Sequence, residues 1–204
     1  MAPKAETHRL ILEKAKELFS RFGPRRTSVA DIARELHMSP ANVYKFFQTK
    51  DALIEAVGEH FMRELHLELL PLIRAEEKPA WTRLEDVIRA VNRHFIDMIE
   101  ANVTRHGAQF FQNLIEFEIM KREQRWMFIG EFLQCTLRLE LANLLREGVE
   151  KDGLHVDDAS MTAATLLDCL ASSIKPVMLI GITAEAAEER LERQLRLLAR
   201  TVAS

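Results

Sequence analysis

Apolar residues recur every three or four positions along most of the 204-residue chain, which is the spacing of an amphipathic α-helix. The stretch 184–202 shows it most plainly, because a narrow apolar seam there is flanked by charged residues. No segment sustains the period of two that a half-buried β-strand needs. The pattern therefore predicts an all-α protein with about nine helices. These span residues 6–22, 29–36, 40–47, 50–73, 83–101, 103–117, 122–149, 157–181 and 184–202.

Terminating and capping residues set the bounds of the first two helices. Gly23 and Pro24 end the first helix, because both are unfavourable in a helix interior. Thr27 and Ser28 offer N-cap oxygens to the second helix. Asp31 falls in the first turn of that helix, where the helix dipole favours an acidic side chain.

The next two helices begin at equally clear signals. Ser39 and Pro40 open the third helix, because proline lacks an N–H at the one place where none is needed. Thr49 caps the fourth helix. His37 and Met38 form the turn before the third helix.

Bulk composition narrows the class of protein. Hydrophobic residues make up 48% of the chain and charged residues 29%, which allows a packed core and argues against intrinsic disorder. No stretch approaches the roughly 20 apolar residues of a membrane span, and the N-terminus has no signal-type apolar run, so we expect a cytoplasmic protein that does not enter a membrane. Cys135 and Cys169 lie in apolar helical pattern and lack metal-ligand spacing. We expect both to be buried free thiols, with no metal and no cofactor.

Charge is distributed unevenly along the chain. Residues 1–50 hold ten lysines and arginines against five acids, a formal charge of +5; with −3 for the whole chain, the rest carries −8. A basic N-terminal segment on an acidic body favours an anionic partner for that segment. Taken alone, the asymmetry does not distinguish such a partner from ordinary variation in surface charge.

The first three predicted helices have the plan of a helix-turn-helix. Two short helices are joined by a tight turn and crossed by the first helix, and in this plan the third helix enters the DNA major groove. Lysines neutralise phosphates, hydroxyls and helix N-termini bind phosphate oxygens, and asparagine reads base edges. Tyr44, the single tyrosine, is read either as a phosphate anchor or as a surface residue that packs on its neighbour. The predicted DNA-binding residues are Thr27, Ser28, Ser39, Pro40, Ala41, Asn42, Tyr44, Lys45 and Lys50.

Residues 8–61 resemble the DNA-binding domain of TetR/AcrR-family transcriptional regulators. The matching runs are Ile11–Phe19, Thr27–Ala33, Ser39–Phe47 and Thr49–Leu53. Their order and spacing match over some fifty residues, about a quarter of the chain, which is far more specific than a generic helix-turn-helix pattern.

The resemblance also implies roles for single residues. In that family the residues that match Tyr44 and Lys50 hold phosphates. Those that match Ser39, Ala41, Asn42 and Lys45 face the groove. This chain departs from the family pattern at His37, where glycine is usual, and at Gln48, where proline is common. Histidine can occupy a left-handed turn conformation, though at some energetic cost. Neither departure removes a DNA-facing group.

The region after residue 74 carries no motif of comparable specificity. The resemblance implies an effector pocket and a dimer interface there. The aromatic residues of this region suit an apolar cavity, although for any single aromatic a place in a filled core is the favoured interpretation. His94 is read either as a polar contact for an effector or as a hydrogen-bonded core residue. The predicted effector-binding residues are His94, Met98, Phe110, Phe111, Trp126 and Phe132.

The last two predicted helices carry the expected dimer interface. Their seams suit helix packing between two copies, and two helices from each copy would form a four-helix interface. Packing of both helices within their own chain is the alternative. The predicted interface residues are Leu170, Ile174, Val177, Leu191, Leu195 and Leu198. A twofold DNA site independently favours a dimer, because one recognition helix reads few bases.

These observations together predict a ligand-responsive transcriptional regulator. We expect a helix-turn-helix domain at 1–52, joined through the helix 50–73 to an effector-binding and dimerisation domain at 53–204. The partners would be a palindromic double-stranded DNA operator, a second copy of the chain, and a small, largely apolar effector that releases a repressor from DNA. A DNA-binding protein without an effector is the alternative. A helical enzyme is disfavoured, because the sequence has no paired catalytic carboxylates, nucleophile motif, phosphate loop or metal-spaced histidines.

Overall fold

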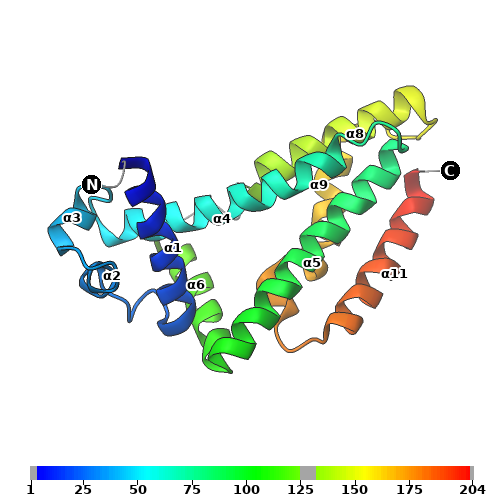
Figure 1. Cartoon of the computed structure of the whole chain (residues 1–204). Coiled ribbons are helices and arrows are strands. Elements are labelled where there is room, and N and C mark those ends of the chain that lie inside the picture. The colour runs from blue at the N-terminus through cyan, green and yellow to red at the C-terminus, as the bar shows by residue number, and fades with distance from the viewer. Residues whose placement is uncertain (1–3, 125–131, 203–204) are drawn as a thin grey trace. The chain divides into compact units, whose positions relative to one another are not determined.

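The computed structural model describes residues 4–124 and 132–202, with side chains described outside 117–134 (Figure 1). Within these ranges the chain is helical and has no β-strand, which confirms the predicted all-α class. The elements are α1 (Lys4–Phe22), α2 (Val29–Glu35), α3 (Pro40–Tyr44), α4 (Lys50–Ile73), α5 (Ala80–His106), α6 (Gln109–Gln124), the π-helical turn η1 (Phe132–Leu137), α8 (Arg138–Lys151), α9 (Ala159–Cys169), α10 (Ala171–Ile174), the 3₁₀ turn η2 (Pro176–Leu179) and α11 (Ala184–Val202). None of the described helices is long and apolar enough to cross a membrane.

The chain forms two compact units. Unit 1 comprises Met1–Arg63 and Glu100–Phe128, and unit 2 comprises Glu64–Ile99 and Ile129–Ser204. Helices α4 and α5 contribute residues to both. This division differs from the predicted domains 1–52 and 53–204, because α6 packs against α1 and so belongs with the N-terminal helices.

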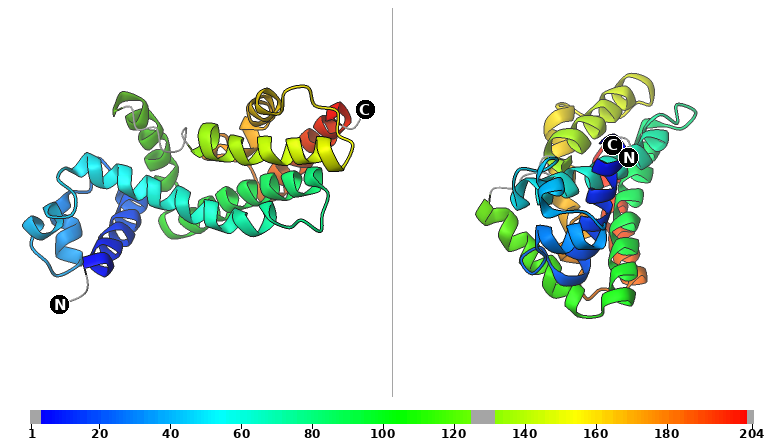
Figure 2. Two further views of the ribbon diagram at one scale, coloured as in Figure 1. Left: turned by 90° about the horizontal axis from the view of Figure 1, so that it is seen from above. Right: turned by 60° about the vertical axis from the view of Figure 1, so that its left-hand side comes forward.

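The core of unit 1 forms where three N-terminal helices meet the start of α4 (Figures 1 and 2). Helix α1 buries one face, which includes Ile11 and Ala15, both fully inaccessible. Helices α2 and α3 are only 7 and 5 residues long, yet Ile32 and Val43 are also fully buried. Helices this short are unstable alone, so their packing on α1 and α4 is what maintains them.

In unit 2, α5 and α11 lie antiparallel and are joined by ion pairs. Arg89 meets Glu192 at 2.7 Å, and four residues further along α5, Arg93 meets Glu188 at 2.9 Å, four residues back along α11. The hydrogen bond from Arg89 holds the pKa of Glu192 below its ordinary value. Helix α8 packs along α9, and the core between these elements is apolar, with Phe95 fully buried.

The helix predicted at 157–181 is broken in the structure into α9, α10 and η2. Pro176 supplies part of the reason, because it disfavours helical backbone at the preceding residue, and Lys175 is accordingly extended (φ −103°, ψ 123°). Three carbonyl groups along the break accept hydrogen bonds from other helices. Gln194 Nε2 donates to Cys169 O at 2.7 Å, Arg190 Nη2 to Ser172 O at 2.5 Å, and Asn92 Nδ2 to Ser173 O at 2.6 Å.

Other predicted helices also have different bounds. The helix predicted at 40–47 ends at Tyr44, and the one predicted at 103–117 is divided between the end of α5 and α6. Helix α5 is longer than the predicted 83–101 and ends at His106, just before Gly107, which has a positive φ of 60°. Of the helix predicted at 122–149, residues 125–131 lie outside the described residues. Residues 122–124 are the end of α6, and the described remainder begins with a π-helical turn before α8.

The predicted dimer seam is a core seam at four of its six positions. Leu170 and Ile174 are fully buried within the chain, and Leu191 and Leu195 are 2% and 1% exposed. These four side chains have no surface with which to contact a second copy, which corrects that prediction. Val177 and Leu198 are half-buried. Amphipathic spacing shows that a face is covered but not whether its own chain covers it.

Cys135 and Cys169 are free thiols, as expected, but both are exposed rather than buried. Each occupies an outward position on its helix. The large exposed apolar side chains of unit 2 include Leu139, Met161 and Leu197.

Arg83 closes the end of α4 from inside unit 2. Its side chain is only 4% exposed, and both Nε and Nη2 donate to the carbonyl oxygen of Ile73, the last residue of α4. Its Nη1 lies 3.0 Å from Glu147 Oε2. Hydrogen bonds from Lys151 and from Arg83 hold the pKa of Glu147 below its ordinary value. Arg83 therefore holds the end of α4 against α5, and its buried positive charge is paired with the carboxylate of Glu147.

Arg83→Met is expected to lower the free energy of unfolding by about 3–5 kcal/mol, because Glu147 and the Ile73 carbonyl lose a buried charged partner. Urea unfolding followed by circular dichroism measures the change. Arg193→Met is the control, since Arg193 is exposed and pairs with Glu189 one turn away, and it should shift stability by less than about 0.5 kcal/mol. Equal small effects in both variants would contradict the role given to Arg83.

Candidate nucleic-acid interface

Helix α2 begins at Ser28, one of the two residues predicted to supply its N-cap, and Ser28 forms a reciprocal capping box with Asp31. The Ser28 hydroxyl accepts from the Asp31 N–H at 3.1 Å, and Asp31 Oδ2 accepts from the Ser28 N–H at 2.9 Å. Hydrogen bonds from Ser28 hold the pKa of Asp31 below its ordinary value. The box fixes the α2 N-terminus, whose unpaired N–H groups suit a phosphate oxygen.

The turn between α2 and α3 contains a residue in a strained backbone conformation. His37 has a positive φ of 52°, and among the described residues other than glycine it alone has a positive φ. Its N–H donates to Arg34 O at 3.1 Å, and the N–H of Met38 donates to Ala33 O at 2.9 Å. The turn is thus hydrogen-bonded on both sides of the unusual residue.

Helix α3 presents its predicted residues outward. Ser39 is the N-cap but its side chain makes no capping hydrogen bond, and Pro40 occupies the first turn. Tyr44 is 45% exposed, while Val43 between the outward residues is fully buried. Asn42 is half-buried. Ser39, Pro40, Ala41 and Lys45 are exposed.

Thr27 does not belong to this surface. It is 2% exposed, and its hydroxyl lies 2.9 Å from Gly23 O and 3.3 Å from Leu18 O, so it donates within unit 1. Its N–H donates to Gly23 O. The predicted DNA contact is therefore wrong at Thr27, which instead ties the start of α2 to the end of α1. Sequence pattern could not separate it from Ser28, because both are hydroxyl residues beside a helix start.

Lys50 stands at the first residue of α4, half-buried, with Nζ 3.2 Å from the carbonyl oxygen of Arg25. Partial burial lowers its pKa from the ordinary value. Thr49 caps the same helix as predicted, accepting from the Ala52 N–H at 3.0 Å. The segment after α1 and the start of α4 are thereby held together.

The structure adds a contact that sequence reasoning missed at the end of α3. The His8 ring of α1 stacks on Phe47 with centroids 4.8 Å apart and lies 6.3 Å from the Phe46 ring. The N-terminal turns of α1 thus support the recognition helix at its C-terminal side. No local signal marks His8, because its partners are nearly forty residues away.

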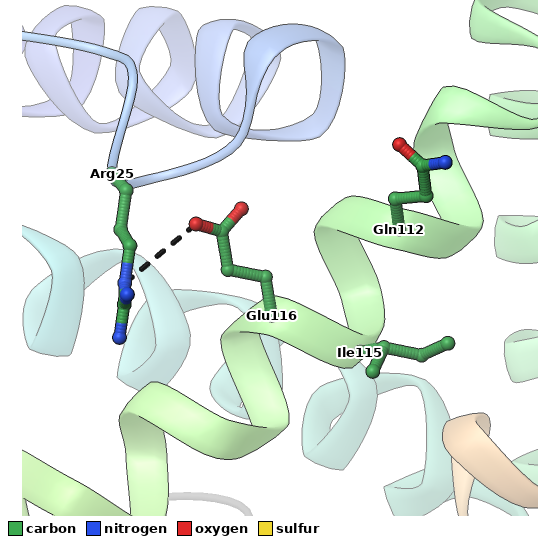
Figure 3. A pocket seen from close by; sticks show the side chains of 4 residues that line it. All are labelled: Arg25, Gln112, Ile115 and Glu116. Atoms are coloured by element: carbon green, nitrogen blue, oxygen red, sulfur yellow. Dashed lines mark ion pairs between the residues drawn. The ribbon is translucent and has the colours of Figure 1, made fainter.

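A hollow of about 280 Å³ lies where the α1–α2 link faces α6 (Figure 3). Arg25 Nε approaches Glu116 Oε1 at 3.6 Å across it, and Gln112 and Ile115 complete its lining. Sequence reasoning missed this contact, because Arg25 and Glu116 lie far apart along the chain.

The predicted effector residues fall in different parts of the molecule. In unit 2, His94 is half-buried with Nδ1 3.0 Å from Glu68 Oε2, and Met98 is half-buried. In unit 1, Phe110 is 5% exposed and Phe111 is half-buried, with ring centroids 6.4 Å apart. Trp126 and the side chain of Phe132 lie outside the described residues. Their grouping around one ligand stays a prediction.

The described residues hold no group of three or more His, Cys, Asp or Glu side chains that is arranged for a metal ion. What unit 1 assembles instead is a short helix with outward polar and basic groups, flanked by a capped helix N-terminus and a lysine. These features define a helix-turn-helix protein of the DNA-binding class.

Comparison with known proteins agrees with this class. Residues 11–57 match the family model described as "Bacterial regulatory proteins, tetR family". The HTH-type transcriptional regulator UidR of Escherichia coli is 26% identical over 193 residues, which cover 92% of this chain and 85% of UidR. These likenesses support a transcriptional regulator of the TetR/AcrR type. Members of this family are DNA-binding transcription factors rather than enzymes.

Solved structures share the fold over nearly the whole chain. A TetR/AcrR-family regulator from Thermobifida fusca superposes with a TM-score of 0.65 at 22% identity, covering 95% of this chain and 96% of its own. Thermus thermophilus FadR, a TetR-family transcriptional repressor in complex with lauroyl-CoA, has a TM-score of 0.61 at 22% identity, covering 94% and 92%. The likeness therefore extends beyond the helix-turn-helix to the helical body.

His37→Gly is expected to raise the free energy of unfolding by about 0.5–1 kcal/mol. Removing Cβ relieves a left-handed conformation that costs about 1–2 kcal/mol, while glycine loses about 0.5–1 kcal/mol through its greater flexibility. Thermal and urea unfolding measure the change. His37→Ala keeps Cβ and should give no gain, so a matching stabilisation by alanine would show that backbone strain is not the cause.

Proposed function

We propose that this protein is a homodimeric repressor that binds a twofold DNA operator through α3 and leaves it when a small, largely apolar effector binds. The outward face of α3 is the observation that carries the proposal. Lys45 and the Tyr44 hydroxyl suit phosphates, and Asn42 and Ala41 suit base edges and a thymine methyl group. The site of action follows from the target, the chromosome in the cytoplasm.

The α3 helix inserts into the major groove while the flanking groups hold the backbone. The α2 N-terminus at Ser28 and the Lys50 ammonium group are the proposed phosphate contacts that set its orientation. Thr27 is not among them. Each backbone contact adds affinity without sequence preference, whereas Asn42 contributes discrimination between bases.

A second copy of the chain doubles the number of base pairs that can be contacted through α3. A five-residue helix contacts few base pairs, and two copies related by a twofold axis read half-sites about one helical turn apart on a palindromic operator. The interface uses outward side chains of the helical body, since Leu170, Ile174, Leu191 and Leu195 lie in the core.

The repressor reading and the apolar effector rest on the shared fold. The structure of the Thermus thermophilus repressor of this fold was solved in complex with lauroyl-CoA. This supports the binding of an effector with an apolar portion. An effector that fits only the conformation unable to bind DNA shifts the population away from the operator. Coupling of this kind is reciprocal: DNA weakens effector binding by the factor by which effector weakens DNA binding.

Tyr44→Phe and Lys50→Ala are each expected to weaken binding to all duplexes, because both remove a phosphate contact. The lysine variant should also flatten the dependence of log affinity on log salt by about 0.9, the release of roughly one counterion. Fluorescence anisotropy at several salt concentrations measures both quantities. Lys78→Ala is the control, because Lys78 lies in unit 2 and pairs with Asp86 at 2.7 Å. Unchanged binding in both test variants would mean that the docking face is wrong.

The effector mechanism is tested by titrating the protein–operator complex with lauroyl-CoA as the first probe, followed by free fatty acids of graded chain length. A bound ligand should lower operator affinity, and operator should lower the affinity for that ligand by the same factor. Isothermal titration in both orders measures the two factors. Operator affinity that is unchanged by every compound shown to bind would contradict release by an effector and leave DNA binding intact.

A further inference from the structure

Asn113 of α6 is a buried polar hub against the end of α1. The residue is 3% exposed. Its Nδ2 donates to the carbonyl oxygen of Ser20 at 3.1 Å, and its Oδ1 accepts from Arg26 Nη2 at 2.9 Å and from Gln109 Nε2 at 3.1 Å. A buried amide with this many partners holds its position and theirs, because loss of any partner leaves a buried polar group unpaired.

The link between α1 and α2 (residues 23–28) is shaped to receive this side chain. Gly23 has a positive φ of 85°, and a Cβ built there would lie 2.9 Å from Asn113 Oδ1. Arg26 reaches in both directions, with Nε donating to Phe22 O at 2.9 Å and Nη2 donating to Asn113. Gly23 leaves room for the Asn113 side chain, and the guanidinium group of Arg26 donates a hydrogen bond to it. The link therefore packs closely around Asn113.

The same link positions two groups of the proposed DNA face. It leads directly into the α2 N-cap at Ser28, and the carbonyl oxygen of Arg25 accepts from Lys50 Nζ at 3.2 Å. Thr27 fastens it to α1 from beneath. A shift of the link would therefore move a helix N-terminus and a lysine together, and hydrogen bonds to phosphate fail over displacements of less than an ångström.

We propose that Asn113 is a positioning residue for operator binding, which holds the link so that Ser28 and Lys50 meet the phosphates in register without itself touching DNA. This inference rests on the proposed binding of DNA by unit 1. Asn113 lies more than fifty residues beyond the stretch 11–57 that the family model matches. It makes α6 a working part of the DNA-binding unit.

The test compares two duplexes with the full-length protein. One is selected by the wild type from a random double-stranded library, and the other is an unselected duplex of equal length. Asn113→Ala should weaken binding to the selected duplex about tenfold, as expected for a lost charge-assisted hydrogen bond. Binding to the unselected duplex should change by less than twofold, because no base contacts fix α3 there and unit 1 can shift until Ser28 and Lys50 meet phosphates again. The salt dependence should stay the same, because the variant removes no charge. Gln112→Ala, an exposed neighbour on α6, is the matched control and should behave as wild type.

A second pair of variants separates positioning from folding. Asn113→Asp keeps an acceptor oxygen for Arg26 and should retain most of the selectivity, whereas Arg26→Gln should lose it. In the double variant Arg26→Gln/Asn113→Ala the losses should not add, because both break the same contact. The comparison sets the effect of Arg26→Gln in the wild type against its effect in Asn113→Ala. A direct contact between Arg26 and a phosphate would be lost equally in both cases, so it does not contribute to the difference.

The outcomes distinguish the inference from the function on which it rests. Equal losses on both duplexes, additive losses in the double variant, or wild-type selectivity in Asn113→Ala would each overturn the positioning role. Should Asn113→Ala not fold by circular dichroism, equal selectivity of Asn113→Asp and Arg26→Gln would overturn it. A wild-type protein that selects no duplex would overturn the proposed function, and this inference with it.

Discussion

The recognition helix of this protein cannot exist without its neighbours. An isolated helix needs about 12–15 residues to be marginally stable, and α3 has five and α2 seven. Both are maintained by burial of single side chains, Val43 from α3 and Ile32 from α2, in the core that α1 and α4 complete. The outward positions of α3 can therefore carry polar groups, because the stability of this helix comes from the rest of unit 1.

A second constraint recurs at helix ends, where carbonyl groups lose their helical partners. Of the buried polar side chains in the described residues, four donate to such a carbonyl in another segment. Thr27 and Asn113 serve the end of α1, Arg83 the end of α4, and Asn92 the break after α10. Each joins two elements that apolar contact alone would leave free to slide, which makes polar burial the means by which this all-helical protein fixes its turns.

Local signals predicted much of the fold because they act over a few residues. The Ser28 N-cap, the Thr49 cap and the bounds 50–73 all follow from neighbours in sequence. Thr27 was misread because a hydroxyl beside a helix start suits either a cap or an inward bond. The break at 170–175 was missed because the side chains that satisfy it come from α5 and α11, and the seam of α11 was assigned to a partner because spacing does not reveal what covers a face.

The break between α9 and η2 also has a consequence for inheritance. Gln194, Arg190 and Asn92 each donate a hydrogen bond to a carbonyl oxygen along the break. A descendant in which this segment formed a continuous helix would therefore leave three polar side chains without their acceptors at once. A descendant that lost those side chains first would strand the carbonyls instead. Neither single step is neutral, so the broken helix and its three donors are expected to persist or disappear as one set, even where the surrounding apolar residues drift.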